Sequence, residues 1–476
     1  MFMKTTSTTS TRSAGSTLLI VLIVGGLIGL TLIAYLKMTG NQNYFVARSQ
    51  SWNITVPVIE AGLEEALTHL NRNGTTNVNM TADGWSLVNG QYTKANYVGP
   101  NYYIVAITFG TQPVIVSQGY TPLQVNYTSG SGPFFADINS SSVLNSYVYR
   151  TVRVMTSADA MFAKGMVAKS RIDLNGNNIH TDSFDSTDPL LSTFGLYDAT
   201  KARDNGDIAT NSSLTNSVNT GNANIWGHIS TGPNGSISIG PNGVAGSKTW
   251  ALDPADLGKI QPGWFSDDMN VSFPPVNPPF SGGGITPNPG NYNGDHYNYI
   301  IDGGNFVLSS LKITGQKDLI VTQPSILWIT GDLTVSGSGQ ITVAAGASLK
   351  LYVGLTTGSG TTAKIGGNGI VNETGNATNM FYYGLPSNTI VAYSGNTAFT
   401  GALYAPNADF TLGGGGTTYY DFVGASVTST VKMNGHFNFH YDENLGKIGP
   451  RRGFIATSWD EIACEPLTPP AGFVVR

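Results

Sequence analysis

The stretch HFNFHYDENLG, residues 436–446, holds the densest group of side chains that could do chemistry. His436, His440, Asp442 and Glu443 fall within it, although the chain has only six histidines and 11% charged residues. If the stretch is a β-strand, alternate residues point to one face, so His436, His440 and Asp442 share a face. Two imidazoles and one carboxylate on a face are a ligand set that suits a transition metal.

The residues between these polar positions support a structural interpretation of the same strand. Phe437, Phe439 and Tyr441 alternate with the histidines and would share the opposite face. An aromatic face of this kind belongs in a hydrophobic core, and the polar face would then meet solvent or a neighbouring domain. We favour this second interpretation, in which the strand caps the end of a β domain, and keep His436, His440 and Asp442 as candidate metal ligands.

A second polar group lies in HTDSFDSTDP, residues 180–189, where Asp182, Asp185 and Asp188 are spaced three apart. Carboxylates gathered in a loop can bind Ca²⁺, but the spacing does not match an EF-hand loop. Asp and Ser are also common in turns because they hydrogen-bond to their own backbone. We therefore favour a turn-rich loop between strands, with calcium binding as the alternative.

A third candidate combines carboxylates with tryptophans in WALDPADLGKIQPGWFSDD, residues 250–268. Exposed aromatic rings beside carboxylates can form a sugar-binding cleft. Tryptophan in a β protein is more often part of the core, and we favour that interpretation. The residues concerned are Trp250, Trp264, Asp253, Asp256, Asp267 and Asp268.

Composition excludes several classes of function. The net charge of −5 contains no basic excess, so nucleic acid is not an expected partner. The single cysteine, Cys464, rules out a disulfide within the chain and a zinc site built from cysteines. The 59 glycines and the scarcity of charged residues indicate many short strands joined by tight turns, and not a helical enzyme.

The segment between Leu18 and Leu36, LLIVLIVGGLIGLTLIAYL, contains no charged residue. As a helix it would be about 28 Å long, close to the roughly 30 Å of a bilayer core. Lys4 and Arg12 precede it without any acidic residue, which favours a cytoplasmic N-terminus and an exported remainder. The segment is too long for the apolar region of an ordinary signal peptide. It is therefore predicted to be inserted in a membrane.

Beyond the apolar segment, one apolar stripe with helical spacing continues as far as residue 70. Pro57 lies within this stripe and is expected to kink the helix. Residues 71–74 supply a helix stop signal. The stripe consists of Phe45, Trp52, Val56, Ile59, Leu63, Ala66 and Leu70.

The N-terminal sequence RSAGSTLLIVLIVGG resembles the start of type IV pilin-like proteins, and especially of PilX-type minor pilins and pilus-assembly proteins. The resemblance implies cleavage by prepilin peptidase between Gly15 and Ser16. VIEAGLEEALTHLN, residues 58–71, is similar to a helical stretch of the same family. Ile20 is a departure, because major pilins carry a Glu at this place, which argues against a major subunit.

The remainder of the chain reads as β-structure. Residues 102–110, 113–120 and 146–156 are predicted strands of an antiparallel sheet, which the pilin resemblance would pack against the long helix. Further along, short strands recur roughly every 7 to 12 residues, as in a sandwich or a β-solenoid. We favour the solenoid because the strands are short. Residues 399–416, 422–435 and 436–445 together resemble a C-terminal β-solenoid domain that accompanies PilX-type N-termini.

The predicted fold is mostly β with one long N-terminal α-helix: a pilin-like helix with an antiparallel sheet, followed by a right-handed parallel β-helix or solenoid. The predicted divisions are a leader peptide (1–15), a transmembrane and amphipathic helix (16–75), an antiparallel β domain (76–155), a β-solenoid-like region (156–273), a Pro/Gly-rich linker or excursion (274–298), a β-solenoid domain (299–446) and a C-terminal strand and tail (447–476).

These observations predict a non-enzymatic structural component or assembly factor of a type IV pilus-like filament. The protein would cross a bacterial inner membrane once between Leu18 and Leu36, with its bulk periplasmic or extracellular. Other pilins or pilus-assembly proteins are the expected partners, and no catalytic residue or cofactor is predicted. The alternative is a membrane-anchored adhesin or carbohydrate-active protein that uses the β-solenoid to bind a surface polysaccharide.

Overall fold

The computed structural model describes residues 14–73, 79–110, 112–123, 147–175, 179–413, 420–434, 437–448, 451–463 and 466–475. Strands make up 45% of the described residues, so the fold is mostly β with one long apolar N-terminal helix, as predicted. The chain divides into two compact units. One consists of residues 1–158 and 453–476, and the other of residues 159–452. His436 and Cys464 lie outside the described residues.

The first unit contains the helix and a six-stranded sheet with the order β1-β2-β3-β4-β5-β32. Neighbouring strands from β1 to β5 are antiparallel. The elements are α1 (Ala14–Asn73), β1 (Ser86–Val88), β2 (Gln91–Val98), β3 (Asn101–Thr108), β4 (Val114–Pro122), β5 (Tyr147–Ala160) and β32 (Arg451–Glu461).

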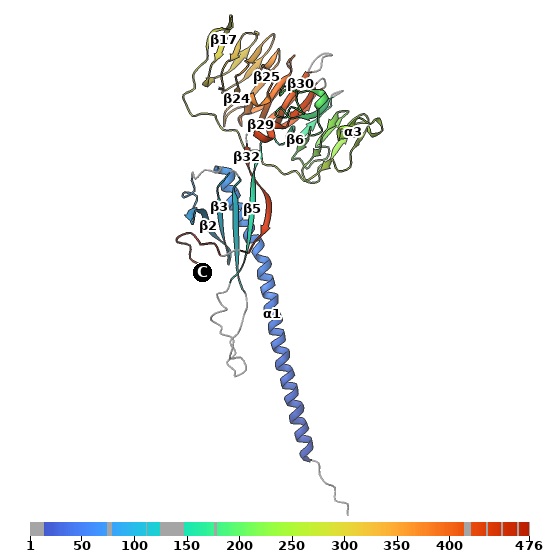
Figure 1. Ribbon diagram of the computed structural model, residues 1–476, viewed down its shortest axis with the longest axis vertical. Helices are drawn as coiled ribbons and strands as arrows, with labels where there is room; N and C mark the ends of the chain where they lie inside the picture. Colours follow the sequence, from blue (N-terminus) through green and yellow to red (C-terminus); the bar gives the residue numbers. More distant parts are fainter. Residues whose placement is uncertain are drawn as a thin grey trace, which may run out of the picture. The chain divides into compact units, whose positions relative to one another are not determined.

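Helix α1 is continuous over 60 residues, through Pro57, and is therefore about 90 Å long. Only its C-terminal part packs on the sheet, as Figure 1 shows. The apolar stripe predicted for this part faces the core in its C-terminal half, whereas Phe45 and Trp52 are exposed. The buried helix residues are Val58, Ile59, Leu63, Ala66 and Leu70, which contact Tyr103, Val105, Ile107, Ile115, Val152 and Val154 of the sheet.

Strand β32 joins this sheet although it lies near the end of the sequence. The sequence predicts a C-terminal strand after residue 446, and its place in the order beside β5 means that residues 159–452 are inserted between two adjacent strands. Arg150 Nε donates to Glu461 Oε1 at 2.9 Å, which links β5 to β32 by side chains as well. The first unit is therefore completed only after the second has been synthesised.

The second unit contains a 21-stranded sheet and a five-stranded sheet. Its helices are α3 (Lys248–Ala251), α4 (Asn444–Ile448) and the 3-10 turns η1 (Ala199–Lys201), η2 (Pro254–Asp256) and η3 (Ala377–Asn379). Its strands are β6 (Met166–Asp173), β7 (His180–Phe184), β8 (Ile208–Thr210), β9 (Val218–Gly221), β10 (Asn224–Trp226), β11 (Ile229–Ser230), β12 (Ile237–Ile239), β13 (Val244–Gly246), β14 (Lys259–Ile260), β15 (Phe265–Ser266), β16 (Asn288–Tyr292), β17 (Asp295–Ile301), β18 (Gly304–Leu308), β19 (Leu311–Ile313), β20 (Leu319–Val321), β21 (Ser325–Ile329), β22 (Leu333–Val335), β23 (Gln340–Val343), β24 (Leu349–Val353), β25 (Thr361–Ile365), β26 (Gly369–Asn372), β27 (Met380–Gly384), β28 (Asn388–Tyr393), β29 (Phe399–Leu412), β30 (Tyr420–Met433) and β31 (Phe437–Asp442).

Parallel pairing links these strands in an order that differs from the sequence. One ladder runs β18-β21-β24-β27-β29-β30 and then continues into β6-β8-β11-β15. The strands between residues 304 and 433 therefore come first in space, and those between 166 and 266 follow. The two β-rich stretches of the sequence form one continuous sheet, joined where β30 pairs with β6 and β31 pairs with β7.

Alternating residues of this ladder face two different apolar clusters. Leu327, Leu351 and Tyr382 occupy equivalent positions on β21, β24 and β27 and lie in the largest core. The next residue on each strand belongs to the second cluster: Trp328, Tyr352 and Tyr383. Each strand is thus apolar on both faces, which is typical of parallel strands covered on both sides.

Residues 267–287 cover this second face, and we call them the return segment because they connect β15 at one end of the ladder to β16 near the other. Met269 N donates to Thr231 O at 2.9 Å, and Tyr404 Oη donates to Pro274 O at 2.7 Å. Phe280 then contacts Trp328 with ring centroids 5.5 Å apart. The return segment overlaps the predicted linker 274–298, of which residues 288–292 are instead strand β16, antiparallel to β17.

Candidate functional site

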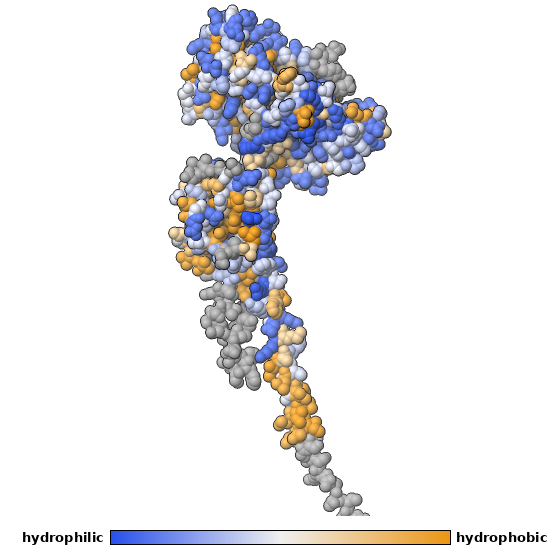
Figure 2. Space-filling model, viewed as in Figure 1, coloured by the Kyte–Doolittle hydropathy of each residue, from blue (hydrophilic) through white to orange (hydrophobic). Residues whose placement is uncertain are grey.

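The N-terminal half of α1 presents a long exposed apolar surface. The most apolar stretch of this helix has a mean hydropathy of 2.7, and none of the stretch is buried within the protein. Leu18, Leu22 and Leu30 are 74%, 73% and 67% exposed, and Figure 2 shows this part of the helix as an apolar column. This part of α1 has the length and composition of a membrane span. So much exposed apolar surface would be unfavourable in water. Gly15 and Ser16 lie at its start.

The C-terminal half of α1 lies unusually close to β4. Ser117 Oγ donates to Ile59 O at 3.0 Å. A Cβ added at Gly119 would lie 2.6 Å from Thr55 O and 2.9 Å from Ile59 Cγ1, so only glycine fits there. The sheet therefore holds the helix by close backbone contact as well as by apolar burial.

Replacing Gly119 by valine is expected to lower the free energy of unfolding of the first unit by about 1–3 kcal/mol, the usual cost of overpacking. Hydrogen exchange of the full-length protein should show reduced protection of residues 58–70. Gly110→Val is the control, because a Cβ there would be 3.8 Å from its nearest neighbour. Equal protection in both variants would contradict the close packing of α1 on β4.

Strands β31 and β7 bring together two polar groups that are far apart in the sequence. The two strands are parallel, with His440 opposite Asp182 and Asp442 opposite Phe184. We call this pair of strands the joint, because it connects the C-terminal strands of the ladder to its N-terminal ones. Since β31 pairs with β30 on its other side, the expectation that it caps the end of the domain is wrong.

His440 lies at the centre of the joint. Its Nδ1 is 2.6 Å from Asp182 Oδ1, and its Nε2 is 3.3 Å from Asp421 Oδ1. His180 Nε2 and Tyr197 Oη approach the second oxygen of Asp182 at 3.1 Å and 2.7 Å. The side chains of His440 and Asp182 are 3% and 1% exposed. The expectation of a solvent-facing polar face is therefore wrong for His440, which the Tyr197 ring covers at a centroid distance of 3.7 Å.

Charge complementarity sets the protonation of this network. Burial lowers the pKa of His440, but the hydrogen bonds and charges of Asp182 and Asp421 together outweigh it and raise the pKa to about 9. For Asp182, burial acts to raise the pKa. The hydrogen bonds from His180 and His440 outweigh this effect, so the pKa of Asp182 lies below its usual value. The joint therefore contains an imidazolium held between two carboxylates near neutral pH.

The remaining acids of the two predicted groups have separate partners. Asp442 Oδ1 accepts from Ser186 N and Asn444 N, both at 3.1 Å, and its burial raises its pKa. Asp185 forms an ion pair with Lys447. Asp188 accepts from Leu190 N at 2.8 Å. No group of three metal-ligating side chains that could hold an ion occurs within the described ranges.

Glu443 extends the joint toward its surface. It accepts from Ser183 Oγ at 2.9 Å, from Asn205 Nδ2 at 2.9 Å and from Arg203 Nη1 at 3.1 Å. These contacts fasten the segment between β7 and β8 to the end of β31. The sequence predicts the strand that carries Asp442, but Asp182, which is expected in a turn-rich loop, lies on β7 instead. The sequence contains no signal for Tyr197, Asp421 or His180 as partners of these acids.

The tryptophans and acids of residues 250–268 do not converge on one site. Asp253 Oδ1 accepts from Ala255 N at 2.9 Å at the start of η2, and Asp256 lies 3.7 Å from Lys259. Trp250 is half-buried in a small apolar cluster. Trp264 stacks on His228 with ring centroids 4.1 Å apart.

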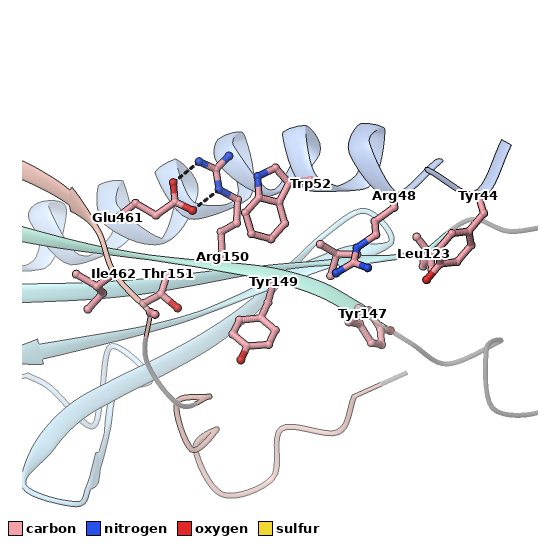
Figure 3. A pocket seen from close by; sticks show the side chains of 12 residues that line it. Tyr44, Arg48, Trp52, Leu123, Tyr147, Tyr149, Arg150, Thr151, Glu461 and Ile462 are labelled. Atoms are coloured by element: carbon pink, nitrogen blue, oxygen red, sulfur yellow. Dashed lines mark hydrogen bonds and ion pairs between the residues drawn. The ribbon is translucent and has the colours of Figure 1, made fainter. Parts of the chain in front are cut away.

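A groove of about 590 Å³ lies along α1 in the first unit, lined by aromatic rings and two arginines. Figure 3 shows Arg150 between Trp52 and Glu461. The Arg150 guanidinium is 5.1 Å from the Trp52 ring centroid, a cation–π contact. The cluster of Trp52, Arg150 and Glu461 links β5 and β32 to the helix, near the point where the contact between α1 and the sheet begins. The sequence did not predict it, because β32 is separated from α1 by almost the whole chain.

Comparison with known proteins adds one finding. Residues 288–448 match the model of a family described as a domain of unknown function, DUF7305. The matched stretch begins with β16 and ends with α4, and it includes β31 but not its partner β7. No curated protein and no solved structure matches the chain.

Proposed function

We propose that this protein is a non-enzymatic structural component or assembly factor of a type IV pilus-like filament, of the PilX-type minor pilin class. The division of α1 supports this proposal: its N-terminal half is apolar and exposed, and its C-terminal half is buried on an antiparallel sheet. A helix of this kind can rest in a membrane and later bury the same surface among the helices of other subunits. Its partners would be other pilins or pilus-assembly proteins.

The second unit would be a right-handed parallel β-solenoid carried by the pilin-like unit. In-register parallel ladders, with one core along their inner face, support this architecture. Its sequence is poor in charged residues and rich in Asn, Ser and Thr, and Asp182, Asp185, Asp188 and Asp442 are all engaged in hydrogen bonds or ion pairs within the unit. We therefore assign it no catalytic role and no cofactor. It would be presented on the outer side of the bacterial inner membrane, with the N-terminus of the chain cytoplasmic.

The experiment that tests this proposal is mass spectrometry of the mature chain from cells that contain prepilin peptidase. Cleavage between Gly15 and Ser16 should remove residues 1–15, and Gly15→Val should prevent the cleavage. Gly40→Val is the matched control, since a Cβ there meets nothing within 4 Å, and it should be processed normally. An intact Met1 in the unsubstituted protein, or cleavage beyond residue 36, would refute the pilin assignment.

A further inference from the structure

A tight turn in the second unit presents a phenylalanine in an unusual way. Thr193 and Leu196 exchange backbone hydrogen bonds of 3.0 Å in both directions, so only Phe194 and Gly195 connect them. Both have positive φ, +55° for Phe194 and +81° for Gly195. This is the backbone of a type I′ turn, where Asn-Gly is the usual pair. The Phe194 side chain is 100% exposed.

Both features of Phe194 are unfavourable in the isolated protein. A bulky side chain is strained in the left-handed region, and an exposed aromatic ring gains nothing from burial. Leu190 and Leu196 beside it are also exposed, at 82% and 45%. We call residues 190–196 the Phe194 turn. A segment that breaks local preferences without an internal gain is expected at functional contacts.

The Phe194 turn is held in place by polar contacts beneath its apolar tip. Lys201 Nζ donates to Pro189 O at 2.9 Å and also to Ser192 O. Thr193 Oγ1 donates to Asp198 Oδ2 at 2.6 Å. Ser192 Oγ donates to Asp188 O at 2.9 Å. The apolar tip is thus pre-organised, which lowers the entropy cost of binding a partner.

The chemistry around the turn favours a protein partner over a membrane. Asp188 and Asp198 flank the tip, and the ammonium group of Lys201 is directed to backbone carbonyls. Anionic lipid surfaces attract basic clusters and would repel these carboxylates. The tip therefore fits a pocket that is lined by aromatic rings and prolines and contains no acidic residue.

The same unit contains such a pocket where the return segment crosses the ladder. It has a volume of about 390 Å³ and no charged lining residue. Tyr352 and Tyr383 form one wall, with ring centroids 4.8 Å apart and nearly parallel planes. We call it the proline–tyrosine pocket. It is lined by Met161, Pro274, Pro275, Val276, Asn277, Pro278, Pro279, Tyr352, Tyr383 and Tyr404.

We propose that the Phe194 turn of one copy of the chain inserts into the proline–tyrosine pocket of a second copy. The two surfaces differ, so the contact is heterologous, and each bound copy still offers one free turn and one free pocket. Such a contact extends into a row of copies unless its geometry closes a ring. The contact goes beyond the proposed packing of pilin-like helices and does not depend on it, because both surfaces belong to the second unit.

Cysteine cross-linking of the full-length protein in membranes tests the contact. In a Cys464→Ser background, Leu190→Cys places a thiol in the exposed segment that carries Phe194, and Asn277→Cys places one in the pocket lining. Mild oxidation should give a ladder of disulfide-linked dimers, trimers and larger species only when both substitutions are present. Leu214→Cys with Asn277→Cys is the matched control, since Leu214 is also an exposed leucine, at 73%, but lies outside the turn.

A second variant separates loss of contact from loss of folding. Phe194→Asn places a residue that tolerates positive φ in the turn, so the melting temperature of the protein should stay the same or rise. In the Leu190→Cys, Asn277→Cys background it should reduce the cross-linked ladder at least tenfold. The proposal is overturned if the ladder survives Phe194→Asn, or if the paired thiols give no cross-link. It is also overturned if Leu190→Cys alone gives dimers, which would indicate a symmetric contact between two turns.

Discussion

Replacing His440 by alanine is expected to lower the free energy of unfolding of the second unit by about 3–5 kcal/mol, the usual cost of removing one partner from a buried ion pair. The physical reason is that Asp182, whose side chain is 1% exposed, would keep its charge without the cation 2.6 Å away. The effect is large because the joint is the place where the C-terminal strands of the ladder meet the N-terminal ones. Urea unfolding of the full-length protein in detergent measures it.

The matched control is His296→Ala, because His296 is exposed and its Nδ1 lies 3.2 Å from the exposed Asn291 Oδ1, without a charged partner at that distance. Hydrogen exchange should show the loss of protection first in β7 and β31. The double variant His440→Ala, Asp182→Ala should lower the free energy of unfolding by less than the sum of the two single variants, because it removes both charges together. Additive costs, or a cost for His440→Ala equal to that of the control, would show that the pair does not hold the joint.

The same network predicts how stability depends on pH. The pKa of His440 is about 9 in the folded protein, against about 6.5 in an unfolded chain. His440 therefore makes its full contribution to the free energy of unfolding below pH 6.5, and this contribution is lost as the pH rises through 9. Over that window the loss should be about 3 kcal/mol. The His440→Ala variant should lack this alkaline decline.

The acidic side of the profile has the opposite cause. Asp182 and Asp421 have lowered pKa values, so their contribution is present above their ordinary pKa and is lost as the pH falls through the lowered values. Asp442 opposes them, because burial raises its pKa and its protonation favours the folded state. We expect maximal stability between about pH 4 and 6.5. A flat profile from pH 6.5 to 9 in the unsubstituted protein would contradict the charge state assigned to His440.

The joint shows which part of the structure could be predicted from the sequence. Strict alternation predicted that Phe437 and Phe439 face the core, and both are buried there. Alternation depends only on local backbone geometry, so it can be read from residues 436–442 alone. Which strand pairs with β31 depends on which strand edge remains free elsewhere in the fold. The local sequence does not contain this information, because the partner strand β7 lies about 250 residues away. For this reason the sequence alone predicts, wrongly, that the strand lies at an end of the domain.

The return segment is a second example. Its prolines cannot donate backbone hydrogen bonds, and residues 274–279 lie outside the strands. The sequence predicts a linker or excursion over residues 274–298, but residues 288–292 and 295–298 of this range belong to β16 and β17. The sequence left open whether they form a linker between two domains or an excursion from one. The contacts of Pro274 with Tyr404 and of Phe280 with Trp328 arise because the strands of the ladder do not follow sequence order, so the chain must return along the ladder. Only the pairing of β30 with β6 reveals this requirement.

Helix α1 was the most predictable element, because its signal is long and local. The helix extends to Asn73, which agrees with the predicted stop at residues 71–74. The sheet that covers residues 58–70 could be predicted only as a fold type. The participation of β32 in that sheet could not, since an insertion of this size leaves no periodic signal in the sequence.

The apolar half of α1 gives the second large prediction, which concerns membrane retention. On an insertion scale, the Leu, Ile and Val residues between Leu18 and Leu36 together contribute on the order of −4 to −8 kcal/mol. A lysine at the middle of the span costs about 2.5–3.5 kcal/mol, besides the loss of the apolar residue that it replaces. One lysine should therefore weaken insertion, and two should abolish it.

We expect Leu27→Lys to reduce the fraction of full-length protein that resists carbonate extraction, and Ile23→Lys with Leu27→Lys to eliminate that fraction. Both residues are more than half exposed on α1, at 56% and 51%, so neither substitution disturbs packing within the protein. Gln42→Lys adds the same charge beyond the apolar segment and should be retained like the unsubstituted chain. A double variant that remained in the membrane would show that retention depends on another part of the protein, because two central lysines cost about 5–7 kcal/mol, which is comparable to the whole apolar gain of this segment.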